Sequence, residues 1–196
     1  VLALLLVNIS ASLPAVLLIC GILFVLALGY TVPPLRLSYR ALGEIDVGLT
    51  HSFAVVCGYI FQGGSIDDAF PWLLSLPMFF AVLPSIIMSG IPDYDADKAA
   101  SKETLAVKFG KKGAAALAIG FTLLTAITVI IFKLYNIIPK ATGNLVYAVI
   151  PHAALLITLV YKYIKNPSPS FRIDSLMIAS LTYLIWLGLI PLINLY

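Results

Sequence analysis

WLLSLPMFFAVLPSIIMSGIPDYDAD, residues 72–97, joins a long apolar run to three closely spaced aspartates. A helix needs about 20 mainly apolar residues to cross about 30 Å of hydrocarbon, because it rises about 1.5 Å per residue. Residues 72–90 contain no charged side chain and satisfy that length. The sequence therefore predicts a helix that spans a membrane and ends where the acidic residues begin.

The composition of the whole chain also indicates a membrane protein. Of the 196 residues, 61% are hydrophobic and 11% are charged, and the mean hydropathy is +1.05. Soluble domains carry charge on roughly a quarter of their residues, and a domain of this size cannot bury so much apolar surface in its own core. These numbers exclude a water-soluble globule and a disordered chain. The net charge of +3 is too small for a nucleic-acid-binding protein.

Five further apolar segments are similar in length to the first. The six predicted spans are residues 13–31, 42–61, 72–90, 114–132, 145–164 and 175–195. Backbone polar groups cannot be left unpaired in lipid, so such spans fold as helices. We expect an all-α polytopic transmembrane helical bundle around a central cavity, formed by a single domain over residues 1–196. Cys20 and Cys57 lie inside apolar runs, and we expect neither a disulfide nor a cysteine metal site.

The first residues form a partial span. Residues 1–7 are apolar but long enough for only about half a bilayer, and the first of them is valine. A signal peptide is disfavoured because no basic residues precede the run. We interpret the run as the end of a helix whose beginning is absent, and we expect an N-terminally truncated domain.

Basic residues are distributed unevenly among the connections. Ten of the 12 fall after the first, third and fifth spans, namely Arg36, Arg40, Lys98, Lys102, Lys108, Lys111, Lys112, Lys162, Lys165 and Arg172. Lys133 and Lys140 fall on the other side. Because basic connections are retained in the cytoplasm, the pattern predicts a multi-pass membrane protein whose acidic cluster faces the cytoplasm. We expect the membrane to be a bacterial inner membrane.

The acidic cluster contains Asp93, Asp95 and Asp97. Carboxylates so close together repel one another unless cations compensate, and Mg²⁺ commonly binds one or two carboxylates together with substrate phosphate. On a helix, Asp93 and Asp97 lie one turn apart on the same face. Continuing that face backwards gives Ser89 and Ser85, so we expect a polar stripe that descends into the membrane. Asp95 points elsewhere, and we expect it to be solvated.

A plain structural interpretation remains open for these acids, in which they cap a helix end and form salt bridges with Lys98 and Lys102. Lysines follow the acids at close range, at positions 98, 102, 108, 111 and 112. Carboxylates for a metal and ammonium groups for an anion suit a metal-bound phosphate or diphosphate. The surroundings favour that function over a simple cap.

A second polar set occurs in the span over residues 42–61. Glu44, Gly48 and His51 fall on one helical face. Glu44 could cap its own helix, where a negative charge suits the dipole, or contact substrate. His51 lies deeper, where an ionisable group indicates function; it could act on a substrate, or equally hydrogen-bond a neighbouring helix.

Two other features have simpler interpretations. We expect His152 to have a packing role, because no polar stripe accompanies it. Pro77 and Pro84 are expected to bend their helix.

Two motifs resemble a known family. Residues 89–110, SGIPDYDADKAASKETLAVKFG, resemble the second aspartate-rich motif of the UbiA superfamily of intramembrane aromatic prenyltransferases. Residues 30–44, YTVPPLRLSYRALGE, look like the family's loop after its fourth helix, in the version common among menaquinone-type members. The family fold has nine helices around a cavity. The resemblance makes the six spans helices four to nine, with the family's first two helices and first Asp-rich motif absent. Ser101 stands where the family usually has glycine.

The resemblance implies a Mg²⁺-dependent transfer of a polyprenyl group from polyprenyl diphosphate to a small aromatic acceptor, in quinone biosynthesis. Similarity of residues 30–44 favours a 1,4-dihydroxy-2-naphthoate-like acceptor over hydroxybenzoate. The enzyme would lie in membrane lipid and bind no nucleic acid. A chain lacking the first motif is expected to be inactive alone.

Residue roles follow from the matching positions. Asp93 and Asp97 are the expected catalytic metal ligands for Mg²⁺, with His51 as a further catalytic candidate. The expected substrate-binding residues are Lys102, Arg36, Arg40, Ser89, Glu44 and Lys98, with Lys102 first; the two arginines could instead be plain cytoplasmic anchors. The alternative function is a cation-binding transporter that uses the Asp93/Asp97 pair. It is disfavoured because transport needs polar groups at mid-bilayer.

Overall fold

The computed structural model describes residues 13–138, 143–166 and 173–193, and every regular element within them is a helix. The elements are α2 (Leu13–Gly29), η1 (Leu37–Tyr39), α3 (Gly43–Phe61), α4 (Ala69–Gly90), α5 (Tyr94–Ala99), α6 (Leu105–Leu134), η3 (Leu145–Ala148), α7 (Val149–Lys165) and α8 (Ile173–Ile193). The prediction of an all-α fold is therefore confirmed for the part of the chain that is described.

Long helices occupy all six predicted spans. By length and composition alone, three helical segments are able to cross a membrane: Ala69–Gly90, Leu105–Leu134 and Leu145–Lys165. The apolar helices Pro14–Gly29 and Ile173–Leu189 are shorter. α3 has 19 residues but carries Glu44 and Asp46 in its first turn, which lowers its hydropathy. Residues 1–7 and the last residues of the sixth span lie outside the described residues.

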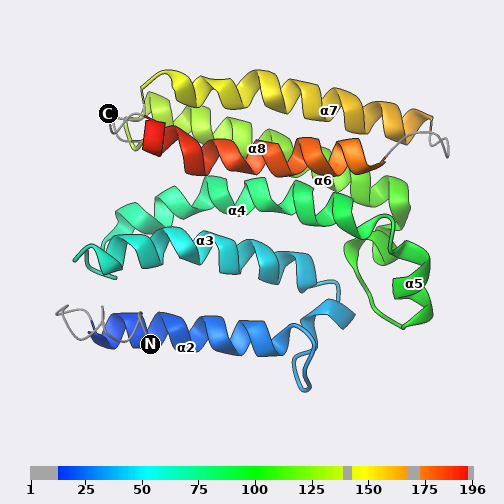
Figure 1. Ribbon diagram of the computed structural model, residues 1–196, viewed down its shortest axis with the longest axis horizontal. Coiled ribbons are helices and arrows are strands. Elements are labelled where there is room, and N and C mark those ends of the chain that lie inside the picture. The colour runs from blue at the N-terminus through cyan, green and yellow to red at the C-terminus, as the bar shows by residue number, and fades with distance from the viewer. Residues whose placement is uncertain (1–12, 139–142, 167–172, 194–196) are drawn as a thin grey trace.

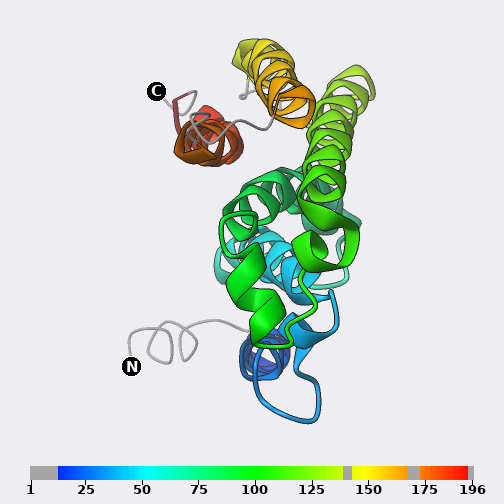
Figure 2. The same cartoon turned by 90° about the vertical axis from the view of Figure 1, so that its right-hand side faces the viewer.

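The long helices run side by side in an arc (Figures 1 and 2). α4 is central and packs against α3, α6 and α8, while α7 covers α6 and α8 on one side and α2 packs against α3 on the other. In Figure 2 the arc is open between α8 and α2. A central cavity and a single domain over residues 1–196 therefore stay predictions.

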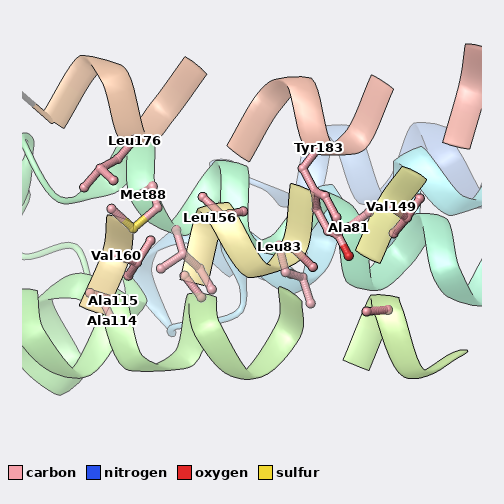
Figure 3. Packing of buried hydrophobic residues seen from close by; sticks show 14 of the residues in the cluster. Ala81, Leu83, Met88, Ala114, Ala115, Val149, Leu156, Val160, Leu176 and Tyr183 are labelled. Carbon is pink, nitrogen blue, oxygen red and sulfur yellow. The ribbon is translucent and has the colours of Figure 1, made fainter. Parts of the chain in front are cut away.

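The core lies between α4, α6, α7 and α8 (Figure 3). Ala81 of α4 and Ala114 and Ala115 of α6 are completely buried in it. Small side chains let helices approach closely, and this close packing is what holds helices together in lipid. A smaller cluster of Val16, Ile19, Val56 and Ile60 joins α2 to α3. α4 remains one helix through Pro77 and Pro84, so the expected bend is a prediction still.

His152 of α7 connects to α8 by both ring nitrogens. Trp186 Nε1 donates to Nδ1 at 2.8 Å, and Nε2 lies 2.9 Å from the carbonyl oxygen of Ala179. The imidazole is therefore the Nε2-protonated, neutral tautomer, which donates to Ala179 and accepts from Trp186. These contacts agree with the packing role expected for His152.

The connections rich in basic residues gather at one end of the bundle. Figure 1 shows at one end of the bundle the α2–α3 connection and α5 with its flanking loops. The last residues of α7 and the first residues of α8 lie at the same end. This arrangement is what the alternation of basic connections predicts. Arg172 and Lys140 fall outside the described residues.

Candidate functional site

Asp93 and Asp97 lie at the start and in the middle of the short helix α5. Asp93 is the N-cap residue, and the Asp97 amide donates to the Asp93 carbonyl at 2.8 Å. The two residues are therefore one helical turn apart, as the spacing predicts. Asp93 is exposed, and the Asp97 side chain is 13% exposed. One acid thus faces solvent, while the other is largely covered by the surrounding chain.

The polar stripe through Ser85, Ser89, Asp93 and Asp97 is interrupted. α4 ends at Gly90, and the Ile91 amide donates to Met88 at 3.3 Å in a tighter turn. Pro92 has no amide hydrogen to continue the helix. The assumption of one continuous helix from Ser85 to Asp97 was therefore wrong. Ser89, whose hydroxyl donates to the Ile86 carbonyl at 2.8 Å, belongs to α4.

Lysines pair with two of the aspartates. Lys102 Nζ lies 3.4 Å from Asp97 Oδ1, and Lys111 Nζ lies 3.1 Å from Asp95 Oδ2. The Asp95 side chain is 82% exposed, which agrees with the expectation that it is solvated. Lys98 is exposed, with its ammonium 6.0 Å from the centre of the Tyr94 ring. The salt bridge of the plain interpretation thus exists for Lys102, but it leaves Asp93 free to bind another group.

Glu44 is buried and contacts a different helix. Its exposed fraction is 6%, and its Oε1 accepts the Leu105 amide, at the start of α6, at 2.7 Å. It therefore caps α6, a helix other than the one that carries it. Glu44 Oε2 and Asp46 Oδ1 are both buried without a hydrogen-bond partner among the described residues. Contact of Glu44 with substrate stays a prediction.

Tyr30 belongs to this site, although the sequence reasoning did not single it out. Burial raises the pKa of its phenol, and the charges that also act on it are those of Glu44, Lys102, Asp97 and Asp46. Tyr30 is held by Ser38, whose hydroxyl donates to the Tyr30 carbonyl at 2.7 Å. The available signal was its position at the first residue of the 30–44 motif.

The two arginines make contacts within their own loop. The Arg36 guanidinium carbon lies 3.9 Å from the centre of the Tyr39 ring, and Arg40 Nη2 donates to the Pro34 carbonyl at 2.9 Å. Both side chains are exposed. They lie at the same end of the bundle as α5 and can reach an anion there, but in this structure they are not joined to the acids.

His51 is on the same helix as Glu44 and Gly48, but it is exposed whereas those two residues are buried. Its side chain is exposed, and its Nδ1 lies 2.8 Å from the Val47 carbonyl, one turn earlier on the same helix. Gly48 instead packs against Phe79, with an added Cβ only 2.9 Å from that ring. A helical face can be buried at one turn and exposed two turns later, when the neighbouring helix diverges. The catalytic role of His51 stays a prediction.

The acids suit magnesium in number and kind. Within the described residues, no group of three or more His, Cys, Asp or Glu side chains could hold a metal ion. Mg²⁺ nevertheless binds through one or two carboxylates when substrate phosphate and water complete its shell. Asp93, exposed, and Asp97, beside an ammonium group, fit that mode of binding.

An apolar cleft lies between α3 and α4, along the first half of α4. Its volume is ≈ 620 Å³, and it is lined by Leu49, Ser52, Phe53, Val56, Ala69, Trp72, Leu73, Ser75, Leu76 and Phe79. Leu49 follows Glu44 by five residues, which is about 7.5 Å along a helix. Charged groups at one end of α3 and an apolar cleft further along the same helix can together hold a molecule with an ionic head and a long hydrocarbon tail.

Comparison with known proteins places the chain in a family. It is 28% identical over 134 residues to "UbiA prenyltransferase domain-containing protein 1" of Dictyostelium discoideum. The matched stretch covers 68% of this chain and 40% of that protein. The chain thus spans less than half of that relative's length. No solved structure is significantly similar to it. The sequence pattern of the UbiA prenyltransferase family matches residues 1–192, and the chain therefore belongs to this family of integral membrane prenyltransferases.

Proposed function

We propose that the protein transfers a polyprenyl group from polyprenyl diphosphate to a small aromatic acceptor at the end of the bundle that carries α5. The observation that supports this most directly is the convergence of Tyr30, Glu44, Asp97 and Lys102 from three separate segments. Acids and an ammonium group meet there at one end of an apolar bundle. A diphosphate ester of a long hydrocarbon requires that combination.

Charge explains the roles that we assign to the basic residues. Breaking the bond between an allylic carbon and diphosphate leaves negative charge on the departing oxygens, and cationic groups fixed nearby stabilise that charge. We assign this role first to Lys102, because its Nζ lies 3.4 Å from Asp97 and its side chain is 36% exposed. Lys98, Arg36 and Arg40 are exposed at the same end and would add to the positive potential.

Asp93 and Asp97 are the residues that we propose to hold Mg²⁺. When bound, magnesium would neutralise part of the charge of the diphosphate and favour its departure. Asp97 would then orient both the ion and Lys102, since its carboxylate already contacts Lys102. Ser89, at the end of α4, is a candidate for a hydrogen bond to the same head group.

The cleft between α3 and α4 is our candidate for the hydrocarbon part of the substrate. Its lining includes Phe53, Trp72 and Phe79. Burial of apolar surface supplies roughly 25 cal/mol per Å², so a long prenyl chain gains affinity without any specific polar contact. Aromatic ring faces can also stabilise an allylic cation.

The finer assignment concerns the acceptor and the compartment. The similarity of residues 30–44 to menaquinone-type members supports an acceptor like 1,4-dihydroxy-2-naphthoate and a role in quinone biosynthesis. The gathering of basic connections at the α5 end supports a cytoplasmic site in a bacterial inner membrane. Transport of a cation is the less favoured alternative, because the family is one of transferases.

The test is a transfer assay on the full-length protein in detergent, with Mg²⁺, labelled farnesyl diphosphate and 1,4-dihydroxy-2-naphthoate. Asp93→Ala and Asp97→Ala should each abolish release of diphosphate. Asp95→Ala is the matched control, because the Asp95 side chain is 82% exposed and pairs only with Lys111 at the surface; its activity should stay close to wild type. Normal turnover in both Asp93→Ala and Asp97→Ala would remove the proposed metal site.

A further inference from the structure

We propose that Glu44 is a positioning residue that holds the segment carrying Lys102 and Asp97 by binding the first amide of α6. This inference rests on the proposed function for its consequence in catalysis, but the contact itself is independent of that function. Glu44 and Leu105 are 61 residues apart in the chain, and the oxygen-to-nitrogen distance is 2.7 Å. Such a short distance is typical of a charge-assisted hydrogen bond.

The start of α6 receives two caps from two parts of the chain. The first four amides of a helix have no partner within it. The Thr104 hydroxyl accepts from the Val107 amide at 3.3 Å, and the Glu44 carboxylate accepts from the Leu105 amide. Thr104 is local and can cap α6 wherever the helix lies. Glu44 belongs to α3, so its bond also fixes where α6 begins relative to α3.

The fixed amide lies next to the ionic groups of the site. The Lys102 amide donates to the Asp97 carbonyl at 2.9 Å, and the Lys102 ammonium pairs with the Asp97 carboxylate. Residues 97–102 thus form a closed turn, and Leu105 follows it by three residues. The Glu44 bond anchors one end of this turn, and the end of α4 anchors the other. Without Glu44 the turn would lose its buried tie to α3.

The burial of Glu44 argues for a specific role. Only 6% of its surface is exposed, and its second carboxylate oxygen has no hydrogen-bond partner among the described residues. Burying a carboxylate is costly unless the charge is compensated, and the positive end of the α6 dipole supplies compensation here. Thr104 already shows that a neutral side chain can cap this helix. The bond that Glu44 adds is the one that joins α3 to α6.

Hydrogen–deuterium exchange on the purified protein in detergent, without substrate, tests the contact. In Glu44→Ala, amides within residues 98–108 should exchange at least about tenfold faster, as expected for loss of a hydrogen bond to a charged group. In Glu44→Gln, the amide oxygen can still accept from Leu105, and exchange should stay within about threefold of wild type. Glu103→Gln is the matched control: it removes an exposed negative charge from the same segment and should leave exchange unchanged.

Kinetics of the full-length protein with Mg²⁺ and farnesyl diphosphate test the consequence. Glu44→Ala should raise KM for farnesyl diphosphate about tenfold, with a smaller effect on kcat, because a displaced Lys102 weakens binding of the head group. Glu44→Gln should restore KM. If Glu44→Ala does not fold, Leu105→Pro removes the same hydrogen bond from the donor side at the first helical position, where proline is tolerated, and should raise KM in the same way.

Three results would overturn the inference. The first is unchanged exchange in Glu44→Ala, and the second is exchange in Glu44→Gln as fast as in Glu44→Ala. The third is loss of activity in Glu44→Gln while its amides stay protected from exchange, which would mean that the carboxylate acts on the substrate directly. If the wild-type protein neither binds nor uses farnesyl diphosphate, the proposed function fails. The exchange comparison alone then decides the positioning role.

Discussion

Gly110 interrupts α6 with a backbone conformation that only glycine adopts easily. Its φ is 74° and its ψ is 161°, inside a helix that otherwise runs from Leu105 to Leu134. For an L-residue, such a conformation costs of order 1–3 kcal/mol. A Cβ added at Gly110 would meet nothing within 4 Å. The cost of Gly110→Ala therefore comes from the backbone alone.

Gly120 in the same helix provides a matched control. It has helical backbone angles, and a Cβ there also meets nothing within 4 Å. Alanine is favoured over glycine in a helix interior by up to about 1 kcal/mol. Gly110→Ala should lower the free energy of unfolding by about 1–3 kcal/mol, while Gly120→Ala should raise it by up to about 1 kcal/mol. The two identical substitutions should thus differ by about 1–4 kcal/mol.

The measurement is unfolding in mixed micelles with increasing dodecyl sulfate, followed by circular dichroism. Because the first turn of α6 carries the amide that Glu44 binds, Gly110→Ala should also lower transfer activity, whereas Gly120→Ala should not. If both variants change the free energy of unfolding in the same direction and by similar amounts, α6 has no left-handed break at Gly110. The break at Gly110 would then not set the direction of the first turn of α6.

Two further predictions concern the loops beside the site. Ser101 has a φ of 56°, so Ser101→Gly, the residue usual in the family, should raise the unfolding free energy by about 1 kcal/mol in the same assay; a decrease would contradict the left-handed conformation. Gly43 packs so tightly that an added Cβ would lie 3.1 Å from Ser38 Cα. Gly43→Ala should lower the free energy of unfolding by about 1–3 kcal/mol and raise KM for farnesyl diphosphate. A variant whose KM equals that of the wild type would show that Tyr30 and Glu44 need no close packing of this loop.

The sequence predicted the helices well, because hydrocarbon requires long apolar runs and the chain has six of them. The helix ends were harder to predict, because polar capping decides them. α6 begins at Leu105, nine residues before the predicted span at 114, since Thr104 caps a turn of motif residues ahead of the kink at Gly110. The polar stripe failed because Pro92 cannot donate to the Met88 carbonyl, and the Ile91 amide uses it instead.

The site was predictable in part, and the reason lies in the range of the contacts. Asp93, Asp97 and Lys102 lie within one short segment, so helical spacing and local charge were sufficient to bring them together. The Glu44 contact with Leu105 spans 61 residues. No periodicity within one helix gives such a contact, because it depends on how α3 and α6 pack. Tyr30 was missed for the same reason.

The site combines one rigid link with one weak ion pair, and the difference between them suits binding of a diphosphate. The Glu44–Leu105 bond is buried, and it holds the backbone of the two helices together. Its removal would leave buried polar groups unsatisfied. The Lys102–Asp97 pair is different, because Lys102 is 36% exposed and the atoms are 3.4 Å apart. Exposed pairs of this kind are worth about 0–1 kcal/mol. If the proposed function holds, Lys102 would therefore leave Asp97 for a phosphate oxygen, and free the carboxylate for a metal, at little cost in free energy and without movement of the backbone that carries both.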